Sequence, residues 1–295
     1  MYITKTDPEI IRKKEEKMKK IVSLLLAVAL LCGCVAMLGS CGGDDVIVSK
    51  VGVQKGTTSK MYADILKGIE VVSYDTFALA AKDMVNGNVD YVIVDKTTGE
   101  ALCREIEGLK VNPIALSSEN YGIAIDKAQP ELKNQINVIL ANKADEIQAI
   151  KDKYMNDDTA AFVGVTPVAK DAAKADKQLV VATNAEFAPW EYKEGNQYFG
   201  IDMEIAQLFA TELGMELVIE DMDFDNVVGS VGKQNIDIAM SGITITAERA
   251  EVVNFSDSYY TESIVIVHKA ADTSLAKCGT AVDLLTVLCV PAEEE

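Results

Sequence analysis

After residue 47, short runs of β-branched and apolar residues alternate with longer segments whose apolar positions recur at helical spacing. In the first half of the chain, the short runs predict strands at 51–53, 71–74, 91–95 and 121–125. The helical spacing predicts helices near 58–67, 76–86, 130–142 and 145–155. Strands and helices thus follow each other in turn over residues 47–155, which is the pattern of an α/β unit.

The same alternation returns in the second half of the chain. Strands are predicted at 179–183, 217–219, 236–241 and 263–267, and helices near 202–213 and 224–232. Residues 156–177 lack sustained periodicity and contain Pro167, so we interpret them as a linker, and we interpret 271–295 as a tail. The chain is therefore predicted to form two α/β lobes, each a mainly parallel sheet flanked by helices.

The N-terminal segment has the pattern of an export signal. Met18 and two lysines precede an apolar run at 21–31, and residues 1–17 add nothing to it, which suggests that translation starts at Met18. LGSC at 38–41 resembles the bacterial lipoprotein cleavage box, in which small residues precede the cysteine that takes the lipid. We therefore predict a signal peptide at 1–40, lipidation at Cys41 and an acidic tether at 41–46.

Other interpretations of this segment stay open. The uncharged run continues to Gly43 and is long enough to span a bilayer, so it could remain as an uncleaved anchor, or the protein could be secreted free. LCGC at 31–34 is a second, weaker cleavage box. Lipidation at Cys41 would leave the mature protein outside the cytoplasm, at the cell surface or in the periplasm, held to the membrane by its N-terminus.

Composition narrows the range of partners. The formal net charge is −18, which disfavours nucleic-acid binding because phosphates need a basic face. The single histidine, His268, argues against a multi-histidine metal site or a Ser-His-Asp triad. Beyond the export segment the cysteines are Cys103, Cys278 and Cys289, too few for a disulfide scaffold, although the last two could pair. We expect no cofactor, no metal and no nucleic-acid partner.

Four stretches in the second half carry a resemblance to a known family. They are VVATNAEFAPWEY at 180–192, FGIDMEI at 199–205, IDIAMSGITITAER at 236–249 and VNFSDSYY at 253–260. In this order they resemble the first lobe of bacterial extracellular solute-binding proteins of the polar amino-acid type, the receptors of ABC importers. The resemblance implies a two-lobed periplasmic-binding-protein-like fold of type II, with residues 178–270 as one lobe.

Residues 47–155 resemble the second lobe of the same family together with its returning C-terminal helices. The matching stretches are VGVQKGTT at 51–58, NGNVDYVIVD at 86–95 and YGIA at 121–124. In the family, the lobe that looks like 178–268 comes first, whereas here it comes last. The chain therefore resembles a circular permutant with one copy of each lobe, an arrangement that surface-located domain ends tolerate. A gene-assembly artefact, or a fusion of two truncated genes, is the alternative.

A free amino acid carries a carboxylate and an ammonium on one carbon, so a binder needs a cation for the first and an anion for the second. The planar guanidinium of Arg249 can grip a carboxylate with two parallel bonds, unless it is a surface residue that caps the preceding turn. Hydroxyls and backbone N–H groups would add donors without adding charge. We expect these from Ser241, Gly242 and Thr244.

The opposite lobe is expected to complete the site. Thr57 and Thr58 begin a predicted helix whose free N–H groups favour an anion, although either hydroxyl could simply cap that helix. Asp95 ends the predicted strand 91–95, at the strand edge that faces a ligand cleft in open α/β sheets. The resemblance implies that Asp95 holds the ligand ammonium, and the alternative is a helix N-cap.

The resemblance also implies that Phe187 and Phe224 sandwich the ligand side chain, where packing within a lobe is the alternative. Trp190 is expected to serve packing alone. Asn184 occupies a position where relatives that bind cationic side chains often carry an acid. A neutral Asn184 disfavours arginine or lysine, while Glu186 nearby restores some negative potential.

These features predict a monomeric binding protein, without enzymatic activity, that closes two lobes around a polar amino acid and delivers it to the membrane permease of an ABC importer. A sensory ligand-binding module of the same fold is the main alternative, and such modules usually continue into a membrane helix. An enzyme such as a dehydratase on this scaffold is a further one, but no acid/base constellation demands it.

Overall fold

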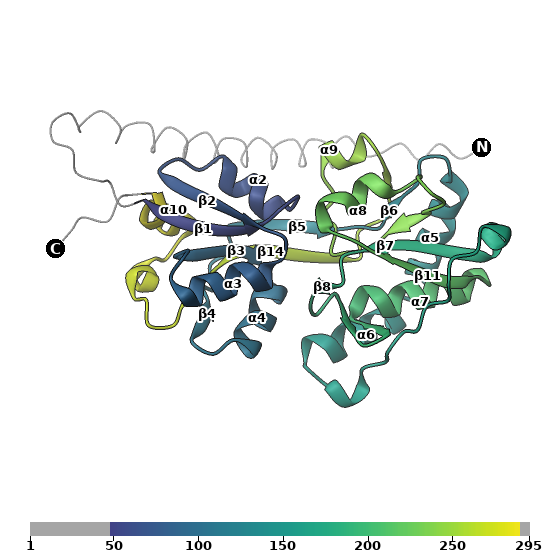
Figure 1. Cartoon of the computed structure of the whole chain (residues 1–295), viewed down its shortest axis with the longest axis horizontal. Coiled ribbons are helices and arrows are strands. Elements are labelled where there is room, and N and C mark those ends of the chain that lie inside the picture. Colours follow the sequence, from purple (N-terminus) through teal and green to yellow (C-terminus); the bar gives the residue numbers. More distant parts are fainter. Residues whose placement is uncertain (1–47, 290–295) are drawn as a thin grey trace, which may run out of the picture.

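Two α/β lobes lie side by side along the long axis of the computed structural model, which describes residues 48–289 (Figure 1). The predicted signal peptide, Cys41 and the tether lie outside the described residues. Two segments cross between the lobes, near 121–124 and 255–260. We call residues 48–121 and 260–289 the β1 lobe and residues 122–259 the β7 lobe.

The β1 lobe is built on a six-stranded sheet in the order β2-β1-β3-β14-β4, with β5 also paired to β14. Its strands are β1 (Ser49–Gln54), β2 (Ile69–Tyr74), β3 (Tyr91–Asp95), β4 (Leu109–Val111), β5 (Ser117–Tyr121) and β14 (Tyr260–Lys269). Its helices are α2 (Thr58–Asp64), α3 (Phe77–Asn86), α4 (Lys96–Glu105) and α10 (Ala281–Cys289).

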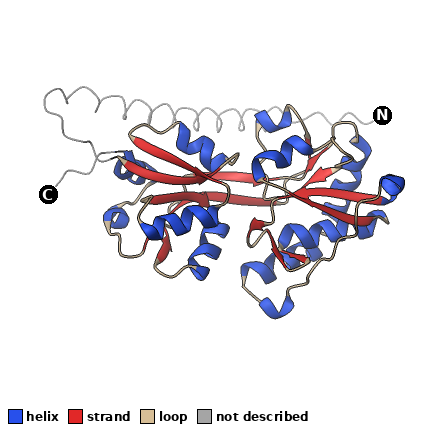
Figure 2. Ribbon diagram, in the orientation of Figure 1, coloured by secondary structure: helices blue, strands red, loops and turns tan. Residues whose placement is uncertain are grey.

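Helices cover both faces of this sheet (Figure 2). Successive side chains along β3 point to opposite faces and pack against the helices on each side. Val92 and Val94 point into a cluster that α3 and α4 complete, whereas Tyr91 and Ile93 join a second cluster with α2 and α10. Leu284 of α10 is fully buried in that second cluster. The segment 271–295, expected to be a tail, therefore supplies core residues in its described part.

The β7 lobe contains a five-stranded sheet in the order β11-β7-β12-β6-β13 and a three-stranded antiparallel sheet in the order β10-β9-β8. The strands are β6 (Ala124–Ile125), β7 (Gln178–Thr183), β8 (Glu186–Phe187), β9 (Glu191–Glu194), β10 (Gln197–Phe199), β11 (Glu216–Asp221), β12 (Ile238–Ala239) and β13 (Asn254–Phe255). The helices are α5 (Pro130–Asn142), α6 (Ala144–Met155), α7 (Ile201–Leu213), α8 (Phe224–Ser230) and α9 (Ala247–Ala250). Helices α5 and α6 pack against α7.

Both main sheets are mainly parallel, as expected, and each is mixed because one strand runs against the others. In the β1 lobe, β1 pairs in parallel with β2 and β3, but β14 pairs antiparallel with β3, β4 and β5. In the β7 lobe, β6 is antiparallel to both of its neighbours. Strands β6 and β14 follow the two crossings, and each enters its new sheet against the direction of the strands already there.

The lobe boundaries also differ from the sequence interpretation. Strand β14, assigned by sequence to the lobe at 178–270, lies in the sheet of the β1 lobe, with Ile264 opposite Asp95. Helices α5 and α6 lie in the β7 lobe although they precede residue 156. Each half of the sequence thus contributes its last elements to the other lobe.

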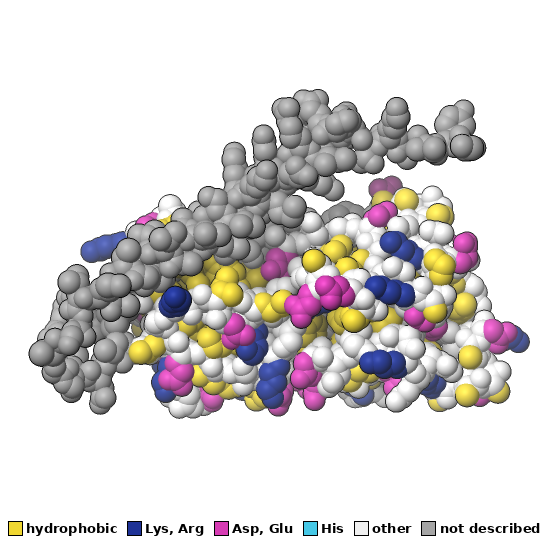
Figure 3. All heavy atoms as spheres, turned by 90° about the horizontal axis from the view of Figure 1, so that it is seen from above, with side chains coloured by type: hydrophobic (Ala, Val, Ile, Leu, Met, Phe, Trp, Pro, Cys, Tyr) yellow, Lys and Arg dark blue, Asp and Glu magenta, His cyan; other side chains and the backbone are white. Residues whose placement is uncertain are grey.

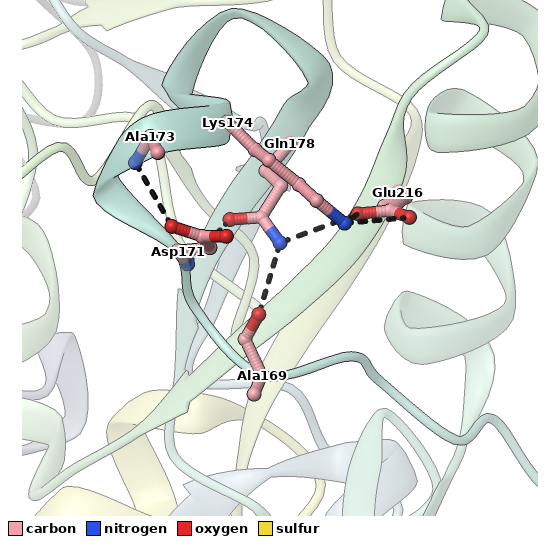
Figure 4. A network of polar contacts seen from close by, with 6 residues as sticks. All are labelled: Ala169, Asp171, Ala173, Lys174, Gln178 and Glu216. Carbon is pink, nitrogen blue, oxygen red and sulfur yellow. Dashed lines mark hydrogen bonds and ion pairs between the residues drawn. The ribbon is translucent and has the colours of Figure 1, made fainter.

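The segment 156–177 is anchored to the β7 lobe rather than hanging between the lobes. It contains the 3-10 helices η1 (Thr159–Ala161) and η2 (Ala172–Lys177). Gln178, at the start of β7, donates from Nε2 to the Ala169 carbonyl at 2.9 Å and accepts from the Asp171 N–H at 2.8 Å (Figure 4). Lys174 reaches Glu216 of β11 at 3.2 Å. This network fixes the point at which the segment enters the sheet.

Charged side chains of both signs are interspersed with apolar atoms on the face shown in Figure 3. Within residues 48–289, no helix combines the length and apolar character needed to cross a bilayer. The same part of the chain contains no disulfide between Cys278 and Cys289. No group of three or more metal-binding side chains lies together there.

Candidate functional site

Nine of the ten side chains that the sequence assigned to ligand binding surround one small cavity where the lobes meet. The β1 lobe contributes Thr57, Thr58 and Asp95, and the β7 lobe contributes Phe187, Phe224, Ser241, Gly242, Thr244 and Arg249. Gln54 of β1 is an additional lining residue. The cavity has a volume of about 10 Å³, room for about one water molecule, so the lobes are closed upon each other.

Arg249 reaches across the lobe junction. Its Nη1 donates to the Thr244 carbonyl at 2.8 Å, and its Nη2 donates to the carbonyl of Gly56 in the β1 lobe at 3.0 Å. The guanidinium carbon lies 5.6 Å from the ring centre of Phe224. In this closed form the guanidinium therefore bonds backbone carbonyls of both lobes.

Asp95 is buried and does not cap a helix. It occupies the N-cap position of α4, but its side chain makes no capping bond and instead accepts from the Tyr121 hydroxyl at 2.6 Å. Burial raises the pKa of Asp95 to about 8, against the lowering effect of the Tyr121 bond. An ammonium placed beside Asp95 would stabilise its ionised form.

Glu119 of β5 is a polar residue of the cleft that sequence reasoning missed. Its Oε2 accepts from Thr58 of the β1 lobe and from Thr244 of the β7 lobe, each at 2.6 Å. Thr57, by contrast, caps α2 by accepting from the Lys60 N–H at 3.1 Å. The sequence could have indicated Glu119 by its position, because it is a charged residue two positions before Tyr121, where the chain crosses between the lobes.

Gly242 does not offer the backbone donor that was expected of it. Its N–H donates to Asp202 Oδ2 at 2.9 Å, which leaves no free proton for a ligand. Asn184 lies behind the cavity rather than in its lining, because its Oδ1 accepts from Gln54 at 3.0 Å and its Nδ2 donates to the Met222 carbonyl at 3.0 Å. Asn184 therefore joins the two lobes.

A buried pair of acids, Glu191 and Asp202, supports the turn that contains Ser241 and Gly242. Both carboxyl groups are fully buried. Glu191 Oε1 accepts from the Ser241 hydroxyl at 2.6 Å, while its Oε2 accepts no hydrogen bond. Burial, reinforced by the neighbouring Asp202, raises the pKa of Glu191 well above its usual value. Glu191 therefore keeps its proton and can share it with Asp202, whose other oxygen accepts from Tyr259.

Aromatic side chains line the junction as well. Phe187 borders the cavity and lies 5.9 Å from Phe77 of the β1 lobe, measured between ring centres. Trp190, expected to serve packing alone, is fully buried against Tyr121 and donates from Nε1 to Thr97 Oγ1 at 2.8 Å. Because Thr97 belongs to the β1 lobe, Trp190 also ties the two lobes together.

A close backbone approach between the lobes at this site gives a testable prediction. Gly56 has φ of +73°, and a Cβ there would lie 2.8 Å from Asp225 Cα of the opposite lobe. Gly56→Ala should therefore hold the lobes apart and weaken ligand binding about tenfold or more, measured by calorimetric titration. Gly108→Ala is the matched control, since Gly108 has φ of +87° and nothing within 4 Å of a Cβ. Equal losses in both variants would assign the effect to backbone strain alone.

Comparison with known proteins finds a family to which the second half of the chain is similar. Residues 179–287 match the family of bacterial extracellular solute-binding proteins, family 3. Over this segment, the chain is similar to that family. The family 3 segment runs from β7 into α10, and it includes all four stretches on which the resemblance was based. Residues 48–155 lie outside the match.

The family 3 segment is similar to several named proteins. The arginine-binding extracellular protein of Bacillus subtilis is 41% identical over 93 residues, which are 32% of this chain and 36% of that protein. The cyclohexadienyl dehydratase of Pseudomonas aeruginosa is 38% identical over 82 residues, 28% of this chain and 31% of that protein. The chain spans about a third of the length of the curated relatives it matches.

Among solved structures, one match has higher identity over part of this chain, and another covers most of the chain at low identity. The arginine-bound domain 1 of TmArgBP is 34% identical, with a TM-score of 0.28, over 40% of this chain and 97% of that domain. The GluR0 ligand-binding core in complex with L-glutamate covers 83% of this chain and 92% of its own, at 11% identity and a TM-score of 0.43. The match of residues 179–287 to the family confirms the resemblance of the second half, whereas the permuted order and the lipid anchor stay predictions.

Proposed function

We propose that this protein binds a free amino acid between its two lobes, outside the cytoplasm, and delivers it to the membrane permease of an ABC importer. The observation that carries the proposal is the convergence of Arg249 and Asp95 from opposite lobes on one cavity. Each would meet one charge of a zwitterion, so the ligand itself would hold the lobes closed. Delivery to an ABC importer rests on the family of residues 179–287.

We propose further that the bound amino acid carries a cationic side chain. Asp95 and Glu119 supply two carboxylates at the junction, against the single guanidinium of Arg249. A ligand with two cationic groups and one carboxylate complements that set. The names of similar proteins from several bacteria include arginine-binding and histidine-binding ones. The second acid at Glu119 offsets the neutral Asn184, which by itself disfavours such ligands.

A thermal-shift screen of the twenty amino acids tests this function, followed by calorimetric titration of the best ligand. Binding to the folded state raises stability by about 2.7 kcal/mol at a hundredfold excess over Kd. We expect arginine to give the largest shift, with histidine or lysine next. A neutral amino acid at the top would reject the cationic specificity, and twenty null results would reject the amino-acid site.

The order of the lobes is proposed to be a genuine circular permutation. Both halves of the sequence contribute strands to both sheets, and nine of the ten expected ligand-site residues line one cavity although their sequence order is reversed relative to the family. A productive permutation predicts that strand 263–267 runs close to 51–53. It shares their sheet, but β3 lies between them. One chain thus completes both lobes.

Cys41 should carry diacylglycerol and form the N-terminus of the mature protein, since LGSC at 38–41 resembles a lipoprotein cleavage box. Several acyl chains hold a protein at a membrane firmly, whereas one does so only marginally. Mass spectrometry of the N-terminal peptide from native membranes checks this. The Cys41→Ser variant has no thiol to carry the lipid. If that variant is cleaved elsewhere or secreted, it should be absent from the membrane fraction. An unmodified peptide that runs through 38–41 would show that the segment is uncleaved.

A catalytic function is the second candidate, because Asp95 with a pKa of about 8 would hold a proton near neutral pH, as a general acid must. The match to a cyclohexadienyl dehydratase gives this candidate a precedent in sequence. Incubating the purified protein with each amino acid and analysing the products by mass spectrometry separates the two functions. Unchanged ligands favour the binding protein.

A further inference from the structure

A second and much larger cavity lies between the lobes, away from the proposed amino-acid site. Its volume is about 590 Å³, within the range of about 300–1,000 Å³ typical of small-molecule sites. It lies between α3 and α4 of the β1 lobe and the end of α6, η1 and the β8–β9 hairpin of the β7 lobe. Figure 1 shows α4 and β8 facing each other at this junction.

The two cavities have no lining residue in common. Phe77 lines the large cavity and Phe187 lines the small one, and their rings, 5.9 Å apart between centres, separate them. Glu186, expected from sequence to add negative potential to the amino-acid site, instead lines the large cavity. A ligand in the large cavity would therefore be a separate molecule from the amino acid.

The walls of the large cavity are apolar and aromatic. Ala101 and Leu102 of α4 are buried there, and Tyr154 stacks on Phe162 with ring centres 4.1 Å apart and planes at 19°. Tyr192 of the β8–β9 hairpin adds a further ring. Such surfaces desolvate the body of an organic ligand and attract cations to their faces.

One buried polar atom in this wall lacks a partner. Thr98 is 3% exposed and lines the cavity, and its Oγ1 makes no hydrogen bond. An unpartnered buried hydroxyl costs free energy, which a hydrogen bond to a bound ligand would recover. Thr98 thus places a buried hydroxyl without a partner in the wall of the cavity.

The charges around the cavity favour a cation. Its lining contains four carboxylates, Glu105, Asp157, Glu186 and Glu194, and a single cation, Arg104. Arg104 Nε lies 3.9 Å from Asp157 Oδ2, so this cation is already opposed by one of the acids. The remaining three carboxylates come from both lobes and stay exposed, where they would attract a positive group at the cavity mouth.

We propose that this cavity is a second ligand site, distinct from the amino-acid cleft, that takes an organic ammonium ion with an apolar or aromatic body. The body packs against Leu102 and the Tyr154–Phe162 stack, Thr98 bonds the ligand, and the ammonium lies among the carboxylates at the mouth. Because both lobes line the site, such a ligand stabilises their closed arrangement and is linked to amino-acid affinity.

The probe for the test is 2-phenylethylammonium, titrated calorimetrically into the full chain, with 2-phenylethanol and 3-phenylpropionate as its neutral and anionic counterparts. We expect the ammonium to bind at least tenfold more tightly than the alcohol, and the carboxylate to bind least. Equal binding of all three, or preference for the carboxylate, would overturn the proposal.

Variants place the probe within the molecule. Glu105→Gln with Glu186→Gln removes two exposed charges and should weaken the ammonium at least threefold without affecting the fold. Ala101→Phe fills the cavity and should abolish binding. Arg249→Ala should weaken the probe less than threefold, through the loss of its bond across the lobes to Gly56, while it weakens amino-acid binding about a hundredfold. The proposal would be overturned if Arg249→Ala no longer bound the probe. It would also be overturned if Ala101→Phe still bound the probe while melting at the parent's temperature, because the probe would then lie elsewhere.

Discussion

Arg249→Ala is expected to weaken amino-acid binding about a hundredfold, which corresponds to about 2.7 kcal/mol. A charged hydrogen bond contributes about 1.5–3 kcal/mol, and the guanidinium can offer two to a carboxylate. Its loss also leaves the ligand carboxylate desolvated and unpaired in a closed cleft. Calorimetric titration with the best ligand of the screen measures the effect.

Two further variants define what the guanidinium does. Arg249→Lys should recover only part of the affinity, because an ammonium cannot reproduce two parallel bonds. Glu248→Ala is the matched control, since Glu248 precedes Arg249 in α9 and is exposed. We expect Glu248→Ala to bind like the parent. Parent-like affinity in Arg249→Ala would show that the ligand carboxylate is held elsewhere.

The sequence predicted those elements whose pattern depends on local chain geometry. Strand β3 is buried on both faces and reads as a continuous apolar run, so its strand state and the place of Asp95 at its end could both be inferred. Helix α3 starts at a capping Thr76 and ends at Gly87 in the left-handed conformation, which are ordinary helix boundaries. Local signals of this kind do not depend on the order of the lobes along the chain.

The β8–β9 hairpin was absent from the predicted elements, and helix α4 entered only as the alternative in which Asp95 caps a helix, because their sequences lack a clear period. Helix α4 contains Thr97, Thr98 and Gly99 where apolar residues would mark a buried face. Gly99 is buried, and it packs so closely that an added Cβ would lie 3.0 Å from the Val267 side chain of β14. Close packing against a strand from the far end of the chain cannot be read from a local pattern.

The polar partners in the site were less predictable than the site itself. The types of residue at Arg249 and Asp95 indicated their chemistry, and the structure brings both to the cavity. The loss of the Gly242 N–H to Asp202, and the contacts of Glu119 with threonines of both lobes, depend on tertiary contacts between distant segments. A sequence identifies candidate donors, whereas the fold decides which of them remain available.

Glu191→Ala and Glu191→Gln should differ strongly in their effect on the free energy of unfolding. At pH 5, Glu191→Ala should be about 2–4 kcal/mol less stable than the parent, because it leaves a cavity and removes the acceptor of the Ser241 hydroxyl. Glu191→Gln keeps an oxygen that accepts from Ser241 and an N–H₂ that can donate to Asp202. At pH 5 it should lie within about 1 kcal/mol of the parent.

The pH dependence of the free energy of unfolding distinguishes a protonated Glu191 from a side chain that contributes only packing. The folded protein keeps a proton on Glu191 at pH values where the unfolded chain, with a glutamate pKa of 4.5, has lost it. Folding therefore takes up a proton, and the parent should lose up to about 1.4 kcal/mol per pH unit through this group as the pH rises above 4.5. Glutamine has no proton to lose. Glu191→Gln should therefore overtake the parent in stability between pH 5 and pH 8.

Denaturant unfolding of parent and variants at pH 5, 6, 7 and 8 measures this difference. Glu194→Gln, in the same hairpin but exposed, is the matched control and should follow the parent at every pH. Other buried acids such as Asp95 add their own slope to all four proteins, so the informative quantity is the gap between Glu191→Gln and the parent. A gap that stays constant from pH 5 to pH 8 would mean that Glu191 is ionised in the folded state, and that the turn carrying Ser241 rests on a charged pair rather than on a shared proton.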